Sequence, residues 1–131
     1  VPVQQTGDGS PELRGGIGRM TSPGVGITRP VKIEILRYLV EINPRAEVTG
    51  SVNTVVIKDG QFTGHNTDGL GFTRSLANCI GDAARGRAFF IIGAGGASRA
   101  VCFSLAEHCQ ASSFVITDVV AEAGKSLAGE I

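Results

Sequence analysis

The stretch "FFIIGAGGASRAV" (Phe89–Val101) decides the fold of this sequence. It begins with apolar residues that favour a buried strand, passes through a glycine-rich turn, and continues with small residues that favour a helix. A second apolar stretch, "SSFVITDVV" (112–120), is predicted to be a strand, and "AEAGKSLAGEI" (121–131) begins a second helix. Strand, helix and strand at this spacing form a βαβ unit, so we expect two parallel neighbouring strands.

The turn carries a G-x-G-x-x-G/A pattern, with Gly93, Gly95 and Ser98 at its three small positions. The first glycine permits a tight turn, the second lets backbone approach a pyrophosphate, and the small third residue lets helix and strand pack closely. The start of the helix directs N–H groups and a positive dipole end toward an anion. The alternative is a glycine-rich turn with a structural role alone. The pattern predicts a dinucleotide site formed by Gly93, Ala94, Gly95, Gly96, Ala97 and Ser98.

Asp118 ends the second strand, at about the distance beyond the glycines where dinucleotide-binding units carry an acid. Such a carboxylate accepts hydrogen bonds from the ribose hydroxyls and repels a 2′-phosphate. No arginine follows in the next few positions, so the charge favours NAD over NADP as the cofactor. The alternative role for Asp118 is the N-cap of the helix that follows it.

The composition restricts the class of protein. Of 131 residues, 42% are apolar, which supports a packed core, and 12 basic residues balance 12 acidic ones. This balance favours neither nucleic acid nor an anionic membrane as a partner. The first residues show no charged-then-apolar pattern of a signal segment, and the three cysteines lack metal-ligand spacing, so we expect reduced thiols in a cytoplasmic protein. Since the sequence begins with Val1 and stops soon after a helix begins, we expect a piece of a longer protein.

The N-terminal half has the alternation of strand and helix signals that is typical of an α/β fold. After a loop-like segment with a short helix near 11–19, the pattern predicts a strand, a helix that stops at Asn43-Pro44, a hairpin with an Asp-Gly turn, and a second helix that ends near Gly81. These elements are expected at 24–28, 31–44, 52–65 and 68–80. The polar segment "DAARGR" (82–87) then predicts a connection between two lobes.

Four blocks, "GVGITRPVK", "GSVNTVV", "GHNTDGLGF" and "GAGGASRA", occur in an order and spacing that resembles the shikimate dehydrogenase family, quinate/shikimate dehydrogenases included. The resemblance covers residues 24–131. It implies a substrate-binding lobe at 1–82 and a Rossmann-type NAD(P)-binding lobe at 83–131 that is incomplete at its C-terminus. It also implies an enzyme that transfers a hydride reversibly between a nicotinamide and a ring alcohol, reducing 3-dehydroshikimate to shikimate.

The resemblance assigns the proton chemistry to a pair of residues. Lys32 matches the lysine of the family's "T-x-P-x-K" block, and Asp68 is the aspartate of "NTDG". Partial burial lowers the pKa of a lysine amine, whereas a neighbouring carboxylate raises that pKa and fixes the direction of the amine, and the sequence leaves the balance of the two effects open. Such a pair suits proton transfer at the reacting oxygen. Thr28 and Asn53, with the same lysine and aspartate, match positions that bind the ring hydroxyls. Read without the resemblance, Lys32 is a solvated lysine at a helix start and Asn53 an asparagine that supports a strand.

The sequence departs from the family pattern in places. Arg29 and Val31 replace the residues usual around the proline, and a serine pair that holds the substrate carboxylate is not found in residues 1–16. A substrate-contacting glutamine would lie beyond Ile131. Two alternatives therefore stand beside the main interpretation: an NAD-dependent quinate/shikimate dehydrogenase, and a non-catalytic regulatory relative that binds the ring acid or the nucleotide. The expected ligands are small molecules, without a metal, a nucleic acid or a membrane.

Overall fold

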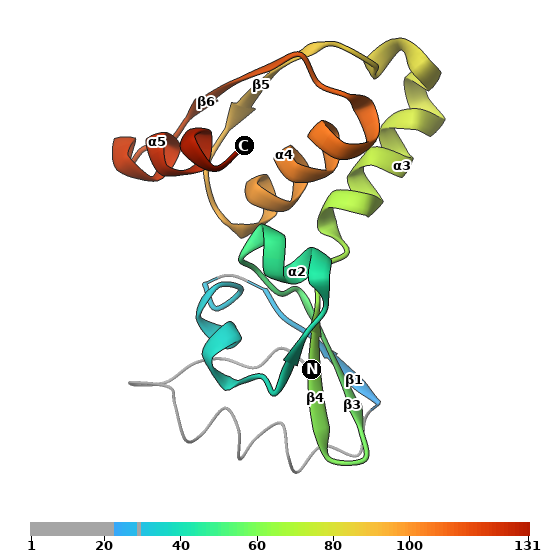
Figure 1. The fold of residues 1–131 in the computed structure, drawn as a ribbon, viewed down its shortest axis with the longest axis vertical. Helices are drawn as coiled ribbons and strands as arrows, with labels where there is room; N and C mark the ends of the chain where they lie inside the picture. The colour runs from blue at the N-terminus through green and yellow to red at the C-terminus, as the bar shows by residue number, and fades with distance from the viewer. Residues whose placement is uncertain (1–22, 29) are drawn as a thin grey trace. The chain divides into compact units, whose positions relative to one another are not determined.

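The computed structural model describes residues 23–28 and 30–131, which form two compact units. The first extends to Asn66 and the second runs from Thr67 to Ile131 (Figure 1). Each unit is described by itself. Arg29 and the short helix predicted near residues 11–19 lie outside the described residues.

The first unit is built on a four-stranded sheet in the order β1-β3-β4-β2. The central strands form the predicted hairpin, antiparallel from the pair Thr54↔His65 to the pair Lys58↔Gln61. The edge strand β1 is antiparallel to β3, and β2 runs parallel to β4. The strands are β1 (Gly24–Gly26), β2 (Glu41–Ile42), β3 (Thr54–Lys58) and β4 (Gln61–His65).

The hairpin turn confirms the role predicted for the Asp-Gly pair. Asp59 and Gly60 have φ angles of 51° and 74°, so both adopt the left-handed conformation. Two such residues in a row match the twist of the flanking strands. The turn fixes the register of the hairpin and thereby the position of Asn53, the residue before β3.

The helix predicted across 31–44 is wrong. The structure has a short 3₁₀ helix, η1 (Glu34–Tyr38), then β2, and then a new helix, α2 (Pro44–Thr49). The chain leaves the helical conformation at Leu39, with ψ 144°, because the next residues pair with β4. The proline begins a helix instead of ending one, since Asn43 is extended and its side chain caps the Arg45 N–H at 3.1 Å.

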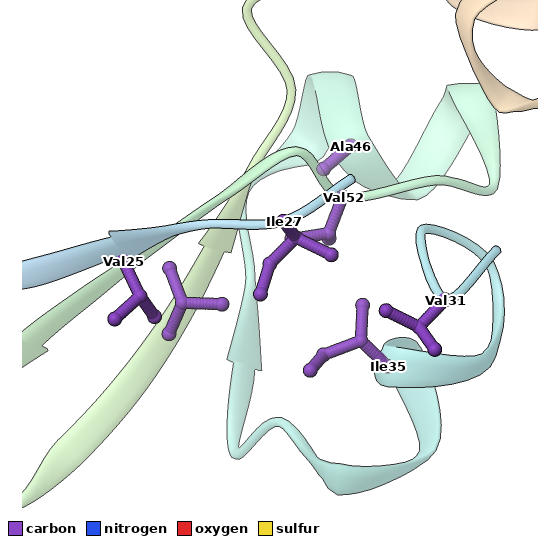
Figure 2. Close-up of a cluster of buried hydrophobic side chains, with 7 residues drawn as sticks. Val25, Ile27, Val31, Ile35, Ala46 and Val52 are labelled. Carbon is purple, nitrogen blue, oxygen red and sulfur yellow. The ribbon is translucent and has the colours of Figure 1, made fainter. Parts of the chain in front are cut away.

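The core of the first unit lies between the sheet and the helical segments. Figure 2 shows buried aliphatic side chains from β1, η1, α2 and β3 pointing toward one another. Ile35 and Val55 are essentially inaccessible to solvent. The cluster consists of Val25, Ile27, Val31, Ile35, Ala46, Val52 and Val55. Burying these aliphatic residues holds the segment around Lys32 against the sheet.

The second unit confirms the predicted βαβ arrangement and the helices on either side of it. Its strands are parallel neighbours in register from Ala88↔Ser113 to Ile92↔Thr117. Ala94, Cys102 and Leu127 form the buried cluster on one face of the sheet, while Phe90 and Val115 are exposed on the other. The elements are α3 (Asp68–Ile80), η2 (Gly81–Ala84), β5 (Ala88–Ile92), α4 (Gly96–Cys109), β6 (Ser113–Thr117) and α5 (Ala121–Glu130).

Helix α3 packs closely on α4 (Figure 1). The Thr73 and Ser104 hydroxyls are 3.2 Å apart, and Gly69 lies against the Ala100 carbonyl. The compact units therefore divide before α3, earlier than the lobe boundary predicted at 82–83, because this helix packs on the βαβ unit that follows it. Its assignment to the substrate lobe by function stays a prediction.

The three cysteines lie on helices of the second unit. Cys79 is exposed, Cys109 is partly buried and Cys102 is buried. Burial raises the pKa of the Cys102 thiol above its ordinary value, which makes it less reactive. Among the residues that the structure describes, no helix is long and apolar enough to span a bilayer.

Candidate functional site

The glycine turn between β5 and α4 has the backbone that its sequence predicts. Gly93 has φ 100°, a conformation that side-chain-bearing residues rarely adopt, and its N–H donates to the Thr117 carbonyl at 2.7 Å. Gly95 occupies the N-cap position of α4, and no side chain caps that end of the helix. A Cβ placed on Gly95 would meet no protein atom within 4 Å. Backbone here is open to a ligand at a helix N-terminus, as the dinucleotide pattern requires.

Asp118 lies beside this turn. One of its carboxylate oxygens accepts the Ala94 N–H at 2.6 Å, and the other accepts the Val120 N–H at 2.8 Å. The N-cap of α5 is Val120, so the alternative of Asp118 as that N-cap is not what the structure shows. The predicted ribose contact stays a prediction, but the carboxylate is at the turn where that contact would form.

In the first unit, backbone hydrogen bonds bring three predicted substrate residues to one end of the sheet. The Ile27 N–H donates to the Asn53 carbonyl at 2.7 Å, which places Thr28 next to that strand. The Val52 N–H donates to the Lys32 carbonyl at 2.8 Å. Thr28 is exposed, while Lys32 and Asn53 are partly buried. Backbone hydrogen bonds thus bring the segments that carry Thr28, Lys32 and Asn53 together, and their hydroxyl, amine and amide are groups of the kind that bind a polyhydroxylated ligand.

Asn53 also has the structural role that the sequence left open. Its side-chain oxygen accepts the Thr54 hydroxyl at 2.9 Å, and its N–H donates to the His65 carbonyl at 3.0 Å. The residue therefore supports the start of β3 and joins it to the end of β4. These contacts fix its position and are compatible with a ligand contact from its amide group.

The end of β4 is fixed by a buried hydrogen-bond network that the sequence did not reveal in full. The amide of Asn66, the residue that follows β4, donates to the carbonyl and the hydroxyl of Ser51 at 3.0 and 2.8 Å. Ser51 is fully buried. No local pattern marked it as the partner, since 15 residues separate the two.

Asp68 begins α3, the first element of the second unit, and is partly buried. A carboxylate in the first turn of a helix is stabilised by the helix dipole. Lys32 belongs to the first unit and Asp68 to the second. Their pairing therefore stays a prediction.

Arg99, in the first turn of α4, has a partner that sequence reasoning missed. Its guanidinium forms a bidentate ion pair with Glu130 at the end of α5, and the Ser126 hydroxyl donates to the same carboxylate at 3.0 Å. The hydrogen bond from the guanidinium lowers the pKa of Glu130. This pair ties the first turn of α4 to α5. Because 31 residues separate Arg99 from Glu130, no local sequence pattern predicts this ion pair.

Comparison with known proteins places this geometry in context. Over 92 residues the chain is 46% identical to the shikimate dehydrogenase (NADP(+)) of Bacillus cereus strain B4264, a match that covers 70% of this chain and 33% of that protein. The chain thus spans about a third of the length of the curated relatives it matches. No protein-family model matches it.

Two solved structures extend the comparison. Shikimate 5-dehydrogenase from Thermus thermophilus, in complex with NADP(H) and shikimate, matches with a TM-score of 0.80 and 32% identity, over 96% of this chain and 46% of that one. Quinate dehydrogenase from Corynebacterium glutamicum, in complex with NAD, matches with a TM-score of 0.78 and 33% identity, over 91% of this chain and 42% of that one. The predicted α/β fold class and the resemblance are confirmed: this chain is a partial-length match to the shikimate dehydrogenase family.

Proposed function

We propose that the protein is an oxidoreductase that reduces 3-dehydroshikimate to shikimate reversibly with a nicotinamide cofactor. The observation that carries the proposal is the identity of 46% to a shikimate dehydrogenase, together with a glycine turn of the geometry that a dinucleotide needs. The Thermus thermophilus relative holds NADP(H) and shikimate.

In this proposal one group of residues binds the cofactor and another group binds the substrate. The turn from Gly93 to Ser98 binds the pyrophosphate with backbone N–H groups at the start of α4. The bound nicotinamide supplies or accepts the hydride. Thr28 and Asn53 orient the ring hydroxyls, and each hydroxyl that pairs with a fixed polar group helps to reject analogues that lack it.

Lys32 and Asp68 handle the proton in this proposal. Reducing a ketone needs a proton at the oxygen that becomes the alcohol, and oxidising the alcohol needs the same proton removed. Lys32 donates it from its Nζ, and Asp68 orients the amine toward the reacting oxygen. The main chain of the lysine is anchored by the bond from Val52, so the side chain starts from a fixed point.

Replacing Lys32 with alanine tests the catalytic role. We expect kcat to fall by about 10²–10⁴-fold, the usual contribution of an acid–base group, while equilibrium binding of shikimate changes much less. Lys58→Ala is the matched control, because Lys58 is an exposed lysine at the end of β3, and it should leave kcat unchanged. A Lys32→Ala enzyme with normal turnover contradicts the assignment. A wild-type protein that binds shikimate without turning it over supports the non-catalytic regulatory relative instead.

A second candidate is an NAD-dependent quinate/shikimate dehydrogenase. Two observations favour it: the Asp118 carboxylate lies at the turn, where it would repel a 2′-phosphate, and the Corynebacterium glutamicum relative is a quinate dehydrogenase that holds NAD. The Bacillus cereus relative, by contrast, is named for NADP(+). We favour NAD as the cofactor. Initial rates with NAD and NADP, each measured on shikimate and on quinate, separate the two candidates.

A further inference from the structure

The glycine turn is fastened to the end of β6 at two adjacent points. The Gly93 N–H donates to the Thr117 carbonyl at 2.7 Å, and the Ala94 N–H donates to the Asp118 carboxylate at 2.6 Å. The first bond continues the ladder of the parallel sheet, whereas the second depends on a side chain. The second bond is thus the one that a substitution can remove without changing the backbone of the sheet.

The Asp118 carboxylate is held on both sides. Its second oxygen accepts the Val120 N–H at 2.8 Å, at the start of α5. Behind it, a Cβ placed on Gly124 would lie 3.7 Å from the Asp118 N atom and 3.9 Å from its Cβ, so the helix backbone packs directly against this residue. Ala94 is itself only 8% exposed. Charge-assisted hydrogen bonds and packing therefore hold the carboxylate in place beside the turn.

Holding the turn and contacting a ribose are compatible tasks. A carboxylate has about four acceptor sites, so one carboxylate can accept from backbone N–H groups and from a hydroxyl group at the same time. A turn that is already ordered loses less conformational entropy when a ligand binds. An Asp118 that only contacted the ribose would need no bond to Ala94.

We propose that Asp118 is a positioning residue for the glycine turn. Its tether, defined as the bond from the Ala94 N–H to its carboxylate, keeps the turn in the conformation that receives the pyrophosphate. This inference rests on the proposed nucleotide-binding function and adds to it a role that does not distinguish NAD from NADP. Loss of the tether weakens binding of both cofactors, whereas loss of the charge alone changes only the preference between them.

Two substitutions separate the tether from the charge. Asp118→Ala and Asp118→Asn both remove the negative charge and so relieve repulsion of a 2′-phosphate equally. Only asparagine keeps an oxygen that can accept the Ala94 N–H. We expect the asparagine variant to bind NADPH about tenfold more tightly than the alanine variant, as measured by the Kd from fluorescence titration. Equal Kd values for the two variants overturn the proposal.

Amide hydrogen exchange tests the tether without any cofactor. In the ligand-free protein we expect the Ala94 amide to exchange at least about tenfold faster in Asp118→Ala than in the wild type, with Asp118→Asn between them. The Leu105 amide, in the middle of α4, should keep its rate, which shows that the effect is local. An unchanged Ala94 rate in Asp118→Ala also overturns the proposal.

Glu122→Ala provides the matched control, because Glu122 is a nearby acid on α5 that pairs with Lys125 at 2.8 Å on an exposed surface. It should change neither the NADPH Kd nor the Ala94 exchange rate. If the wild type binds neither NADH nor NADPH, the proposed function fails. The exchange experiment then still decides whether Asp118 holds the turn, so the two failures are distinguishable.

Discussion

Gly69→Ala should destabilise the second unit, because there is no room for a methyl group between α3 and α4. A Cβ placed on Gly69 would lie 2.2 Å from the Ala100 carbonyl oxygen and 2.8 Å from the Ser104 Cβ. Ala100 is 1% exposed and its carbonyl belongs to the helix backbone, so it cannot turn aside as a flexible side chain can. Reaching ordinary contact requires the two helices to separate by about 1 Å.

The expected change in the free energy of unfolding has three contributions, of which two destabilise the variant and one stabilises it. Overpacking of this kind costs about 1–3 kcal/mol. Separation of the helices also weakens the buried contact between the Thr73 and Ser104 hydroxyls, worth about 1 kcal/mol. Replacing glycine with alanine inside a helix returns about 1 kcal/mol. The net change in the free energy of unfolding is a loss of about 2 kcal/mol.

Gly71→Ala is the matched control on the same helix. Gly71 is exposed, and a Cβ placed on it would meet no atom within 4 Å, so only the gain in helix propensity of up to about 1 kcal/mol remains. Both variants can be measured by urea denaturation, followed through hydrogen exchange of the α4 amides so that the signal reports on this unit. Equal stability of the two variants would refute the close α3–α4 contact.

Three further predictions concern other contacts. Asn66→Ala should lower the free energy of unfolding by about 1–3 kcal/mol, because it leaves the buried Ser51 carbonyl and hydroxyl without their amide donor; thermal denaturation measures it. Glu130→Gln should cost less than about 1 kcal/mol at pH 7, since the pair with Arg99 is partly exposed. Because the hydrogen bond from Arg99 lowers the pKa of Glu130 in the folded state, this stabilisation is present above the ordinary pKa of the carboxyl and is lost as the pH falls through the lowered value, so the stabilities of the variant and the wild type should converge at low pH in urea titrations. Gly93→Ala should cost about 1–3 kcal/mol through backbone strain at φ 100° and raise the Kd of NADH, as calorimetry would show.

Sequence reasoning succeeded where the signal was local. The strand, glycine turn and helix around Gly93 are adjacent in the chain, and each has its own pattern: an apolar run, a residue that permits positive φ, and small helix formers. The Asp59-Gly60 turn was predictable for the same reason, since two left-handed residues in a row are a local requirement that this pair meets.

It failed where a distant segment determined the conformation. The apolar spacing after Val31 fits a helix, but Glu41 and Ile42 pair with Thr63 and Gly64 of β4, far along the chain, and this pairing ends the helical conformation at Leu39. Whether this segment forms a helix or a strand depends on the free energy gained by pairing with β4, and the local sequence alone does not reveal that pairing.

Asp118 lies between these cases, and its contact with Ala94 follows from the register of the sheet. The parallel pair Ile92↔Thr117 ends both strands at the same level, so the residues that come next, the glycine turn and Asp118, emerge side by side. A slip of one residue would turn the Asp118 side chain to the opposite face and remove the bond to Ala94. Counting from the two strand ends could therefore have predicted the tether once the register was known. It follows that a substitution which shifts this register should disrupt the turn even if it leaves every glycine in place.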